Sequence, residues 1–261
     1  MSAKIAVDFF SQRANCGGMG QLGGTLANHL LIALELNDDR AEKELQAKVV
    51  ERGELRRIRP GNRLAAAGDW DEIVLMLAHP RVVALGETGL DRYWDHAPIE
   101  MQRDYFDRHL RMSQDRDRTV VIHCRDAQAD VLPMLREAVS RGPLRGVLHA
   151  FSGDAAMAAE CLDLGLYASF AGNATYTNKK FQSLREAAVT IPADRILIET
   201  DSPYLTPEPL RRPCKHGARQ KRNEPALVAH VAAALAALRG VPLDQFVRQT
   251  TANARRLFQL K

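Results

Sequence analysis

Four short apolar runs in the sequence each lead into a side chain that can bind a metal ion. The runs begin at residues 82, 120, 146 and 196, and they lead to Glu87, His123, His149 and Asp201. Two imidazoles and two carboxylates suit Zn, Mn, Fe or another divalent cation. Such a centre can polarise water and neutralise charge on a phosphate, so the four residues predict metal-assisted hydrolysis.

The apolar runs that carry these residues read as buried strands alternating with helices. Nearly continuous apolar strands are typical of a parallel sheet with both faces covered, and the alternation predicts an α/β TIM-like barrel. Active-site residues of such barrels lie at the carboxyl ends of the strands, the position we expect for all four. The sequence predicts strands at 81–87, 119–124, 145–149, 166–171 and 195–201, and helices at 98–114, 127–141, 155–164, 179–188, 225–238 and 242–257.

The first 80 residues do not show this regular alternation of strands and helices. A complete eight-stranded barrel needs three strands there, but only 5–10 reads as a strand, and 55–60 is a poor candidate rich in arginine. We therefore expect one hydrolase domain over 1–261, with a diverged or non-homologous segment at 1–68 and an atypical N-terminal third of the barrel.

Composition indicates an ordinary globular protein. The chain has 261 residues, 46% of them hydrophobic, with a formal net charge of +4. Its apolar runs are too short to span a bilayer, and the N-terminus lacks the pattern of a signal peptide. The four cysteines contain no C-x-x-C pair, which favours free thiols. We expect a cytoplasmic monomer that does not contact membranes.

Six motifs surround or follow the four residues. They are Gly86-Glu87-Thr88-Gly89-Leu90-Asp91, 121–127, 148–153, Ile198-Glu199-Thr200-Asp201 with the residues to 205, 222–225 and 250–254. These motifs resemble those of the TatD-type metal-dependent deoxyribonucleases, in the amidohydrolase superfamily. The resemblance covers about residues 69–261, although Thr119 stands where that family usually has proline.

The resemblance implies a distorted TIM barrel with two divalent cations, Mg, Mn or Zn, that hydrolyses phosphodiester bonds of DNA, often from the 3′ end. It implies that water is the nucleophile and that Glu87 is the carboxylate bridging both ions. His123 and His149 would bind the second ion. Asp201 would bind the first ion and orient the water or take its proton, so Asp201 and Glu87 are the expected catalytic residues.

One part of the family pattern is missing. The family opens with a strand ending in Asp-x-His-x-His, whereas this chain has Asp8 followed by Phe10 and Gln12 at the histidine positions. Loss of two ligands weakens an ion site, so only one ion, or none, would bind. Either the first 60–70 residues are not the family's N-terminal segment, or the chain is a diverged, impaired member.

A basic stretch follows Asp201. Residues 211–222 contain six Lys or Arg, and they could hold a DNA backbone or form a solvated loop. We expect Arg212, Lys215, Lys221 and Arg222 to bind nucleic acid. Arg125, two residues after His123, could contact phosphate or pair with a neighbouring acid such as Asp126. Tyr93 and Trp94 could stack a base or simply cover the rim.

The sequence thus predicts a metal-dependent deoxyribonuclease with DNA as its substrate. Two alternatives remain open at this point. One is a catalytically impaired homologue that binds nucleic acid through the basic stretch. The other is a related amidohydrolase that acts on a different small substrate.

Overall fold

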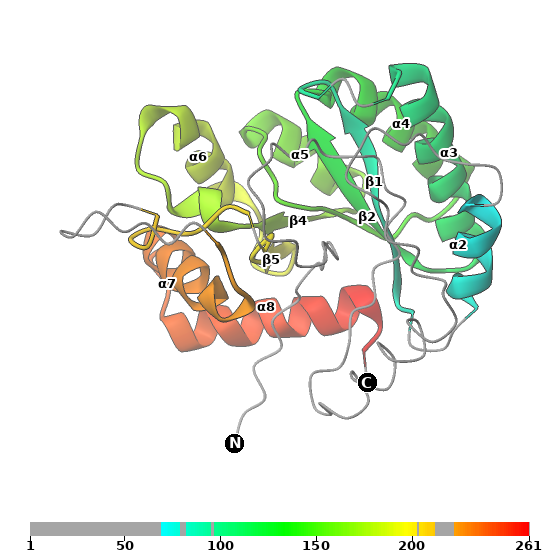
Figure 1. Cartoon of the computed structure of the whole chain (residues 1–261). Helices are drawn as coiled ribbons and strands as arrows, with labels where there is room; N and C mark the ends of the chain where they lie inside the picture. Colours follow the sequence, from blue (N-terminus) through cyan, green and yellow to red (C-terminus); the bar gives the residue numbers. More distant parts are fainter. Residues whose placement is uncertain (1–68, 79–81, 95–96, 203, 212–221, 261) are drawn as a thin grey trace.

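A five-stranded parallel sheet forms the centre of the molecule. The computed structural model describes residues 69–78, 82–94, 97–202, 204–211 and 222–260. Within them the strands lie in the order β1-β2-β3-β4-β5, and every neighbouring pair is parallel (Figure 1). The strands are β1 (Ala84–Asp91), β2 (Thr119–Arg125), β3 (Gly146–Leu148), β4 (Tyr167–Phe170) and β5 (Ile196–Ile198).

Helices connect successive strands, which confirms the predicted parallel α/β arrangement. Pro98 stands directly before the first helical residue of α3, where its fixed φ and missing N–H cost nothing. Asp154 begins α5 by accepting a hydrogen bond from the Met157 amide at 2.9 Å. The helices are α2 (Asp69–Leu77), α3 (Ile99–Asp115), α4 (Gln128–Arg141), α5 (Ala155–Asp163), α6 (Gln182–Thr190), α7 (Val228–Leu238) and α8 (Leu243–Phe258), with 3₁₀ turns η1 (Gly172–Thr175), η2 (Lys179–Phe181) and η3 (Pro225–Leu227).

The structure before residue 92 differs from the prediction in one helix and one strand. Helix α2 was not predicted, and it packs Ile73 and Leu77 against Leu85 of β1. The expected strand at 81–87 is instead β1, which starts at Ala84 and continues to Asp91. The candidate strands at 5–10 and 55–60 lie outside the described residues.

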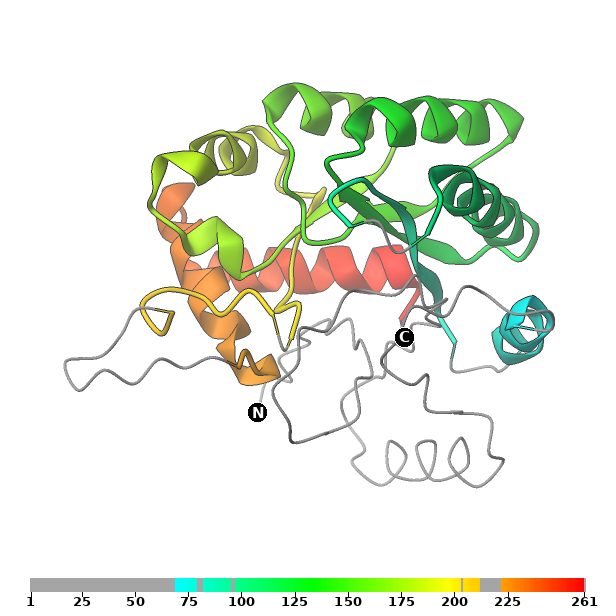
Figure 2. The ribbon, with the colours of Figure 1, turned by 45° about the horizontal axis from the view of Figure 1, so that its top comes forward.

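The sheet has two differently covered faces. Helices α3, α4, α5 and α6 follow one side, and α8 crosses the other (Figures 1 and 2). The larger core joins the first face to helices through residues such as Phe106, Leu135 and Ile122. The smaller core joins the second face to α8, and contains Ala84, Val121, Val147, Tyr167, Leu197, Ala254, Leu257 and Phe258.

Thr119 helps to hold α8 in place. Its hydroxyl donates a 2.6 Å hydrogen bond to the carbonyl of Leu257, and both residues are buried. A proline at position 119 could not make this contact, because its ring carries no hydroxyl. The threonine therefore connects the start of β2 to the last turn of α8.

Two general expectations can be compared with the described residues. Cys124 and Cys161 are free thiols, as predicted, whereas Cys16 and Cys214 lie outside the described ranges. No single described helix is long and apolar enough to cross a membrane. Residues 225–238 and 243–258 meet the length and composition required only as a pair, with a bend of 112° between them.

Candidate metal centre

Strand alternation points three of the site's side chains toward the face that α8 covers. Val121, Val147 and Leu197 all belong to the α8-side core. Successive side chains of a strand point to opposite faces, so residues two positions further share a face. His123, His149 and Glu199 stand two positions after those three core residues. The apolar core residues and the polar site residues thus form consecutive layers on the same face of the sheet.

Glu87 reaches the same face by a different route, and this corrects the predicted position at a strand end. It lies inside β1, four residues before the strand stops at Asp91. The register between β1 and β2 shifts between Leu85 and Thr88, so two β1 residues stand opposite one residue of β2. This bulge turns Glu87 to the α8 side, because one extra residue inverts the alternation.

Glycines allow β1 to approach β2 closely on either side of Glu87. A Cβ at Gly86 would lie 2.6 Å from the carbonyl oxygen of Val121, and one at Gly89 would overlap the carbonyl oxygen of His123. Their φ angles of +144° and +146° also disfavour any other residue type. The two glycines of the motif are therefore needed to bring Glu87 to His123.

Three potential ligands converge at the carboxyl side of the sheet. Ligand atoms of Glu87, His123 and His149 all lie within 4.8 Å of one another. Glu87 Oε1 is 2.6 Å from His123 Nδ1 and 3.3 Å from His149 Nε2. One carboxylate and two imidazoles are suitable donors for a divalent cation, so this group could hold a metal ion. Within the described ranges it is the only such group.

Asp201 lies beside this group, at a longer distance. Its Oδ1 is 3.7 Å from His149 Nε2, and its φ of +56° falls in the left-handed region that Asp tolerates better than most residues. Burial raises the pKa of the Asp201 carboxyl to about 7, against the opposing charge of His149. Buried Asn223 supports the loop by donating 2.6 Å hydrogen bonds to the carbonyls of Thr200 and Tyr204.

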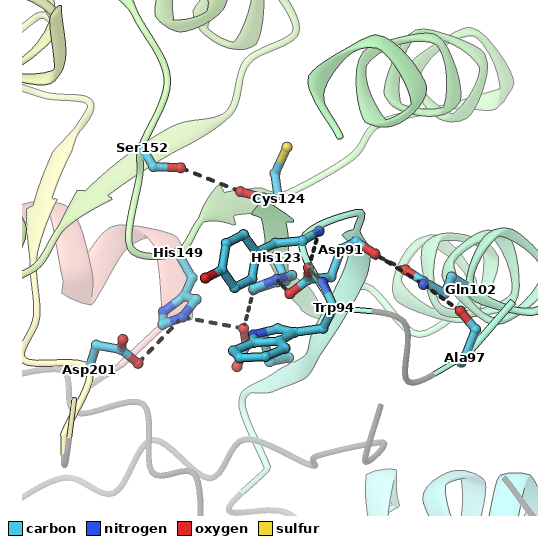
Figure 3. A network of polar contacts seen from close by, with 11 residues as sticks. Asp91, Trp94, Ala97, Gln102, His123, Cys124, His149, Ser152 and Asp201 are labelled. Atoms are coloured by element: carbon cyan, nitrogen blue, oxygen red, sulfur yellow. Dashed lines mark hydrogen bonds and ion pairs between the residues drawn. The ribbon is translucent and has the colours of Figure 1, made fainter. Parts of the chain in front are cut away.

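Two carboxylates behind the group, Asp91 and Glu199, were not predicted as site residues. Asp91 Oδ2 is 3.0 Å from His123 Nε2, and Glu199 Oε2 is 3.0 Å from His149 Nδ1 (Figure 3 shows the Asp91 contact). Glu199 also accepts a hydrogen bond from the Ala150 amide and is fully buried. Both residues belong to the family motifs at 86–91 and 198–205, so the sequence marked them as motif residues. It did not indicate that they contact the two histidines.

The carboxylates raise the affinity of both imidazoles for protons. Burial lowers the pKa of His123, but its hydrogen bonds with Asp91 and Glu87 outweigh burial and raise that pKa to about 9. Burial also lowers the pKa of His149, while the charges of Glu199 and Glu87 raise it well above its ordinary value. The site thus attracts positive charge, and this is a further property that fits a cation.

The predicted nucleic-acid-binding residues are only partly described. Arg125 is exposed, and its guanidinium lies over the Tyr93 ring, 3.9 Å from the centroid; it makes no ion pair with Asp126 or any other described residue. Arg222 is exposed directly before Asn223. Arg212, Lys215 and Lys221 lie outside the described residues.

The burial of His109 in α3 was not predicted from the sequence. Its side chain is buried in α3, with Nδ1 2.6 Å from the Tyr105 carbonyl oxygen and the ring against Trp70. The helical pattern alone did not distinguish the two faces at this position. His109 lies outside the metal-ligand group.

Two solved structures have a fold similar to that of this chain. The structure superposes on YJJV, a TatD homologue from Escherichia coli K12, with a TM-score of 0.67 and 24% identity over 84% of this chain and 83% of the other. A TatD-family hydrolase from Entamoeba histolytica gives a TM-score of 0.65 at 21% identity, covering 87% and 82% of the two chains. These likenesses confirm the predicted TIM-barrel type of fold.

Sequence comparisons give the family. Relatives include the metal-dependent hydrolases YabD of Bacillus subtilis, 39% identical over 70% of this chain and 68% of that protein, and YcfH of Escherichia coli K12, 41% identical over 74% and 68%. The 3'-5' ssDNA/RNA exonuclease TatD of Klebsiella pneumoniae is 37% identical over 72% and 69%. The family model described as "TatD related DNase" matches residues 56–259. The chain therefore belongs to the TatD-related DNase family of metal-dependent hydrolases, in the amidohydrolase superfamily.

Proposed function

We propose that this protein is a metal-dependent nuclease that hydrolyses phosphodiester bonds of DNA. The observation that carries the proposal is the convergence of Glu87, His123 and His149 within 4.8 Å. The family match supports it, as does the 37% identity to a protein named as a 3'-5' ssDNA/RNA exonuclease. A three-donor group of this kind suits hydrolysis of a phosphate ester, where negative charge must be neutralised.

In this proposal each residue of the site has a separate task. Glu87, His123 and His149 hold a divalent ion, which when bound lowers the pKa of water and neutralises charge on the phosphate. Asp201 lies beside His149, with its Oδ1 3.7 Å from Nε2, where it can orient the attacking water and take its proton. Asp91 and Glu199 hold the two imidazoles in position from behind.

Basic residues bind the DNA strand. Arg125 lies on the same rim as the ligands, and Arg222 is exposed beside the loop that carries Asp201. The sequence adds Arg212, Lys215 and Lys221 between that loop and Arg222. Clustered cations attract phosphates mainly by releasing counterions, which gives affinity without sequence preference.

The number of ions is part of the proposal and can be measured. The Glu87 group accounts for one ion, and Asp201 with a bridging Glu87 would contribute to a second. Inductively coupled plasma mass spectrometry of the full chain, after dialysis against Mn or Zn, gives ions per protein. We expect at least one ion, and one fewer in His123→Ala than in the unchanged protein.

A nuclease assay tests the proposal directly. The full chain is stripped with a chelator and incubated with a single-stranded DNA oligonucleotide labelled at either end, with Mg, Mn or Zn added back. We expect metal-dependent shortening of the oligonucleotide, and a loss of at least about 100-fold in rate for Asp201→Asn. Asp126→Asn is the matched control, because Asp126 is exposed and also has a positive φ of 52°.

Other outcomes identify the alternatives. Binding of the labelled DNA without cleavage under any metal would contradict the proposal and support a nucleic-acid-binding homologue. Metal-dependent hydrolysis of amides or lactones, with DNA left intact, would contradict it in favour of a different amidohydrolase. Equal rates for Asp201→Asn and the unchanged protein would remove Asp201 from the mechanism.

A further inference from the structure

Two large aromatic side chains are exposed next to the metal-ligand group. Tyr93 is 56% exposed and Trp94 is 41% exposed, in the loop directly after β1. Their rings lie edge to face with centroids 4.7 Å apart. The guanidinium of Arg125, at the end of β2, lies 3.9 Å from the Tyr93 centroid and 5.7 Å from the Trp94 centroid. The three side chains form one cluster, which we call the rim platform.

The side chain of Asp91 connects the rim platform to the metal-ligand group. Asp91 Oδ1 accepts hydrogen bonds from the backbone amides of Tyr93 at 2.8 Å and Trp94 at 3.0 Å. The other oxygen of the same carboxylate contacts His123 Nε2 at 3.0 Å (Figure 3 draws Asp91, Trp94 and His123 together). The platform is therefore fixed relative to a proposed metal ligand.

A second set of contacts holds the loop to the helices. Arg92 donates to Asp130 of α4 through Nε at 2.5 Å and Nη2 at 2.9 Å, and Arg103 of α3 contacts the same carboxylate. Gln102 of α3 accepts from the Asp91 amide at 2.8 Å and donates to its carbonyl at 3.1 Å. Gln102 also donates to the carbonyl of Ala97 at 2.9 Å, so the chain is held both before and after the aromatic pair.

We propose that Tyr93, Trp94 and Arg125 form a stacking subsite for a base of single-stranded nucleic acid, beside the phosphodiester bond to be cleaved. This inference rests on the proposed function and adds the residues that would contact a base. Exposed aromatic rings and guanidinium planes bind bases of any type, because every base has a π-face. In a duplex those faces are covered by neighbouring base pairs, so the platform selects an unpaired strand.

Two features argue against the simpler role of covering the rim. A covering role would bury the rings, yet about half of each side chain is open to solvent. Arg125 also makes no ion pair within the described ranges, so its charge is not neutralised by a neighbouring carboxylate there. A positive charge stacked on aromatic rings matches a ligand that carries both bases and phosphates.

The test compares oligonucleotides that differ only in their bases. The full chain, without divalent metal, is titrated with fluorescent oligothymidylate and with an abasic strand of the same length and charge, and anisotropy gives both Kd values. We expect the unchanged protein to prefer oligothymidylate by about 5- to 150-fold. The double variant Tyr93→Ala, Trp94→Ala should lose this preference, while Tyr93→Phe, Trp94→Phe should keep most of it.

Further variants supply the control and an independent readout. Leu243→Ala removes an exposed apolar side chain from α8 and should retain the full preference. The chain has two tryptophans, so Trp70→Phe leaves Trp94 as the only one. Stacking should quench its fluorescence with oligothymidylate, and the abasic strand should not. A preference retained by the double alanine variant, or absent from the unchanged protein, would overturn the proposal.

Failure of the subsite and failure of the nuclease proposal give different results. Bis(p-nitrophenyl) phosphate is a phosphodiester without bases, so its metal-dependent hydrolysis reports the metal centre alone. Hydrolysis of this ester without any preference for oligothymidylate would overturn only the subsite. A clear base preference that depends on Tyr93 and Trp94, without hydrolysis of either substrate, would support the subsite and contradict the nuclease activity.

Discussion

At the scale of single residues, each imidazole of the metal-ligand group lies between two carboxylates. His123 contacts Glu87 through Nδ1 and Asp91 through Nε2, whereas His149 contacts Glu87 through Nε2 and Glu199 through Nδ1. A carboxylate behind a histidine ligand fixes the orientation of the ring and makes the other nitrogen a better donor. The outer carboxylates therefore determine how well the two histidines can bind an ion.

The carboxylate of Asp91 should strengthen metal binding by His123. Asp91→Asn keeps an oxygen for the Tyr93 and Trp94 amides but removes the negative charge at His123 Nε2. We expect the affinity for Zn or Mn to fall by about 10- to 100-fold. Isothermal titration calorimetry with the metal alone measures the change, and Asp126→Asn serves as the control. Unchanged metal affinity in Asp91→Asn would show that the carboxylate does not support the ligand.

At the scale of elements, buried polar side chains hold helices in place. Asn253 of α8 is fully buried, and its Nδ2 donates 2.8 Å hydrogen bonds to the carbonyls of Ala193 and Ile196 at the start of β5. His109 of α3 is buried against Trp70, with ring centroids 5.1 Å apart. Both residues stabilise the framework of the site without touching the ligands.

Replacing Asn253 should loosen the packing of α8. Asn253→Ala leaves the buried Ile196 carbonyl without this donor, which costs roughly 1–3 kcal/mol. The carbonyl of Ala193 also loses its donor, but Ala193 is exposed and water can replace the contact. We expect the urea midpoint of unfolding to fall accordingly. Gln245→Ala is a useful comparison, since it removes an exposed amide side chain from the same helix. An equal midpoint for both variants would contradict the prediction.

His109 should make stability depend on pH. Burial lowers its pKa from 6.5 to about 4, against the hydrogen bond with Tyr105, so the folded protein keeps this ring neutral. The unfolded chain binds the proton first as pH falls, and the stability contributed above pH 6.5 is lost progressively toward pH 4. The loss is about 3 kcal/mol over that window.

The variant His109→Phe retains an aromatic ring against Trp70 and cannot titrate. Its free energy of unfolding, measured by denaturant titration at several pH values, should fall less than that of the unchanged protein between pH 6.5 and 4. The comparison isolates one group, because all other ionisable residues are common to both proteins. Parallel pH profiles would contradict the burial of a neutral histidine in α3.

At the scale of the whole molecule, charge governs how a nucleic acid would approach. The formal net charge is +4, and six of the twelve residues at 211–222 are Lys or Arg. These residues follow the loop of Asp201 in sequence, and Arg125 lies on the rim platform. We expect association with DNA to depend strongly on salt.

Removing charge from the basic stretch should change that dependence. The triple variant Arg212→Gln, Lys215→Gln, Lys221→Gln should reduce the slope of log K against log salt by about 2, at roughly 0.7 for each lost phosphate contact on a single strand. A matched loss of three charges elsewhere, at exposed Arg108, Arg116 and Arg248, is the control. Equal slopes for the two triple variants would mean that the basic stretch is not the binding surface.

The sequence alone was sufficient for the strands, most helices and the three residues that converge in the metal-ligand group. Apolar periodicity depends on neighbouring residues, so α3 to α8 and β2 to β5 were predicted within a few residues. The types of Glu87, His123, His149 and Asp201 indicated a metal centre, and the motifs around them indicated the family. These properties are encoded locally along the chain.

The tertiary structure decided which side chains meet. Only the register of β1 against β2 shows that Glu87 sits within a strand and is turned by a bulge toward His123. The contacts of Asp91 and Glu199 with the imidazoles likewise join residues 32 and 50 positions apart. Such distances depend on how separate strands align, and a pattern of neighbouring residues carries no information about that alignment.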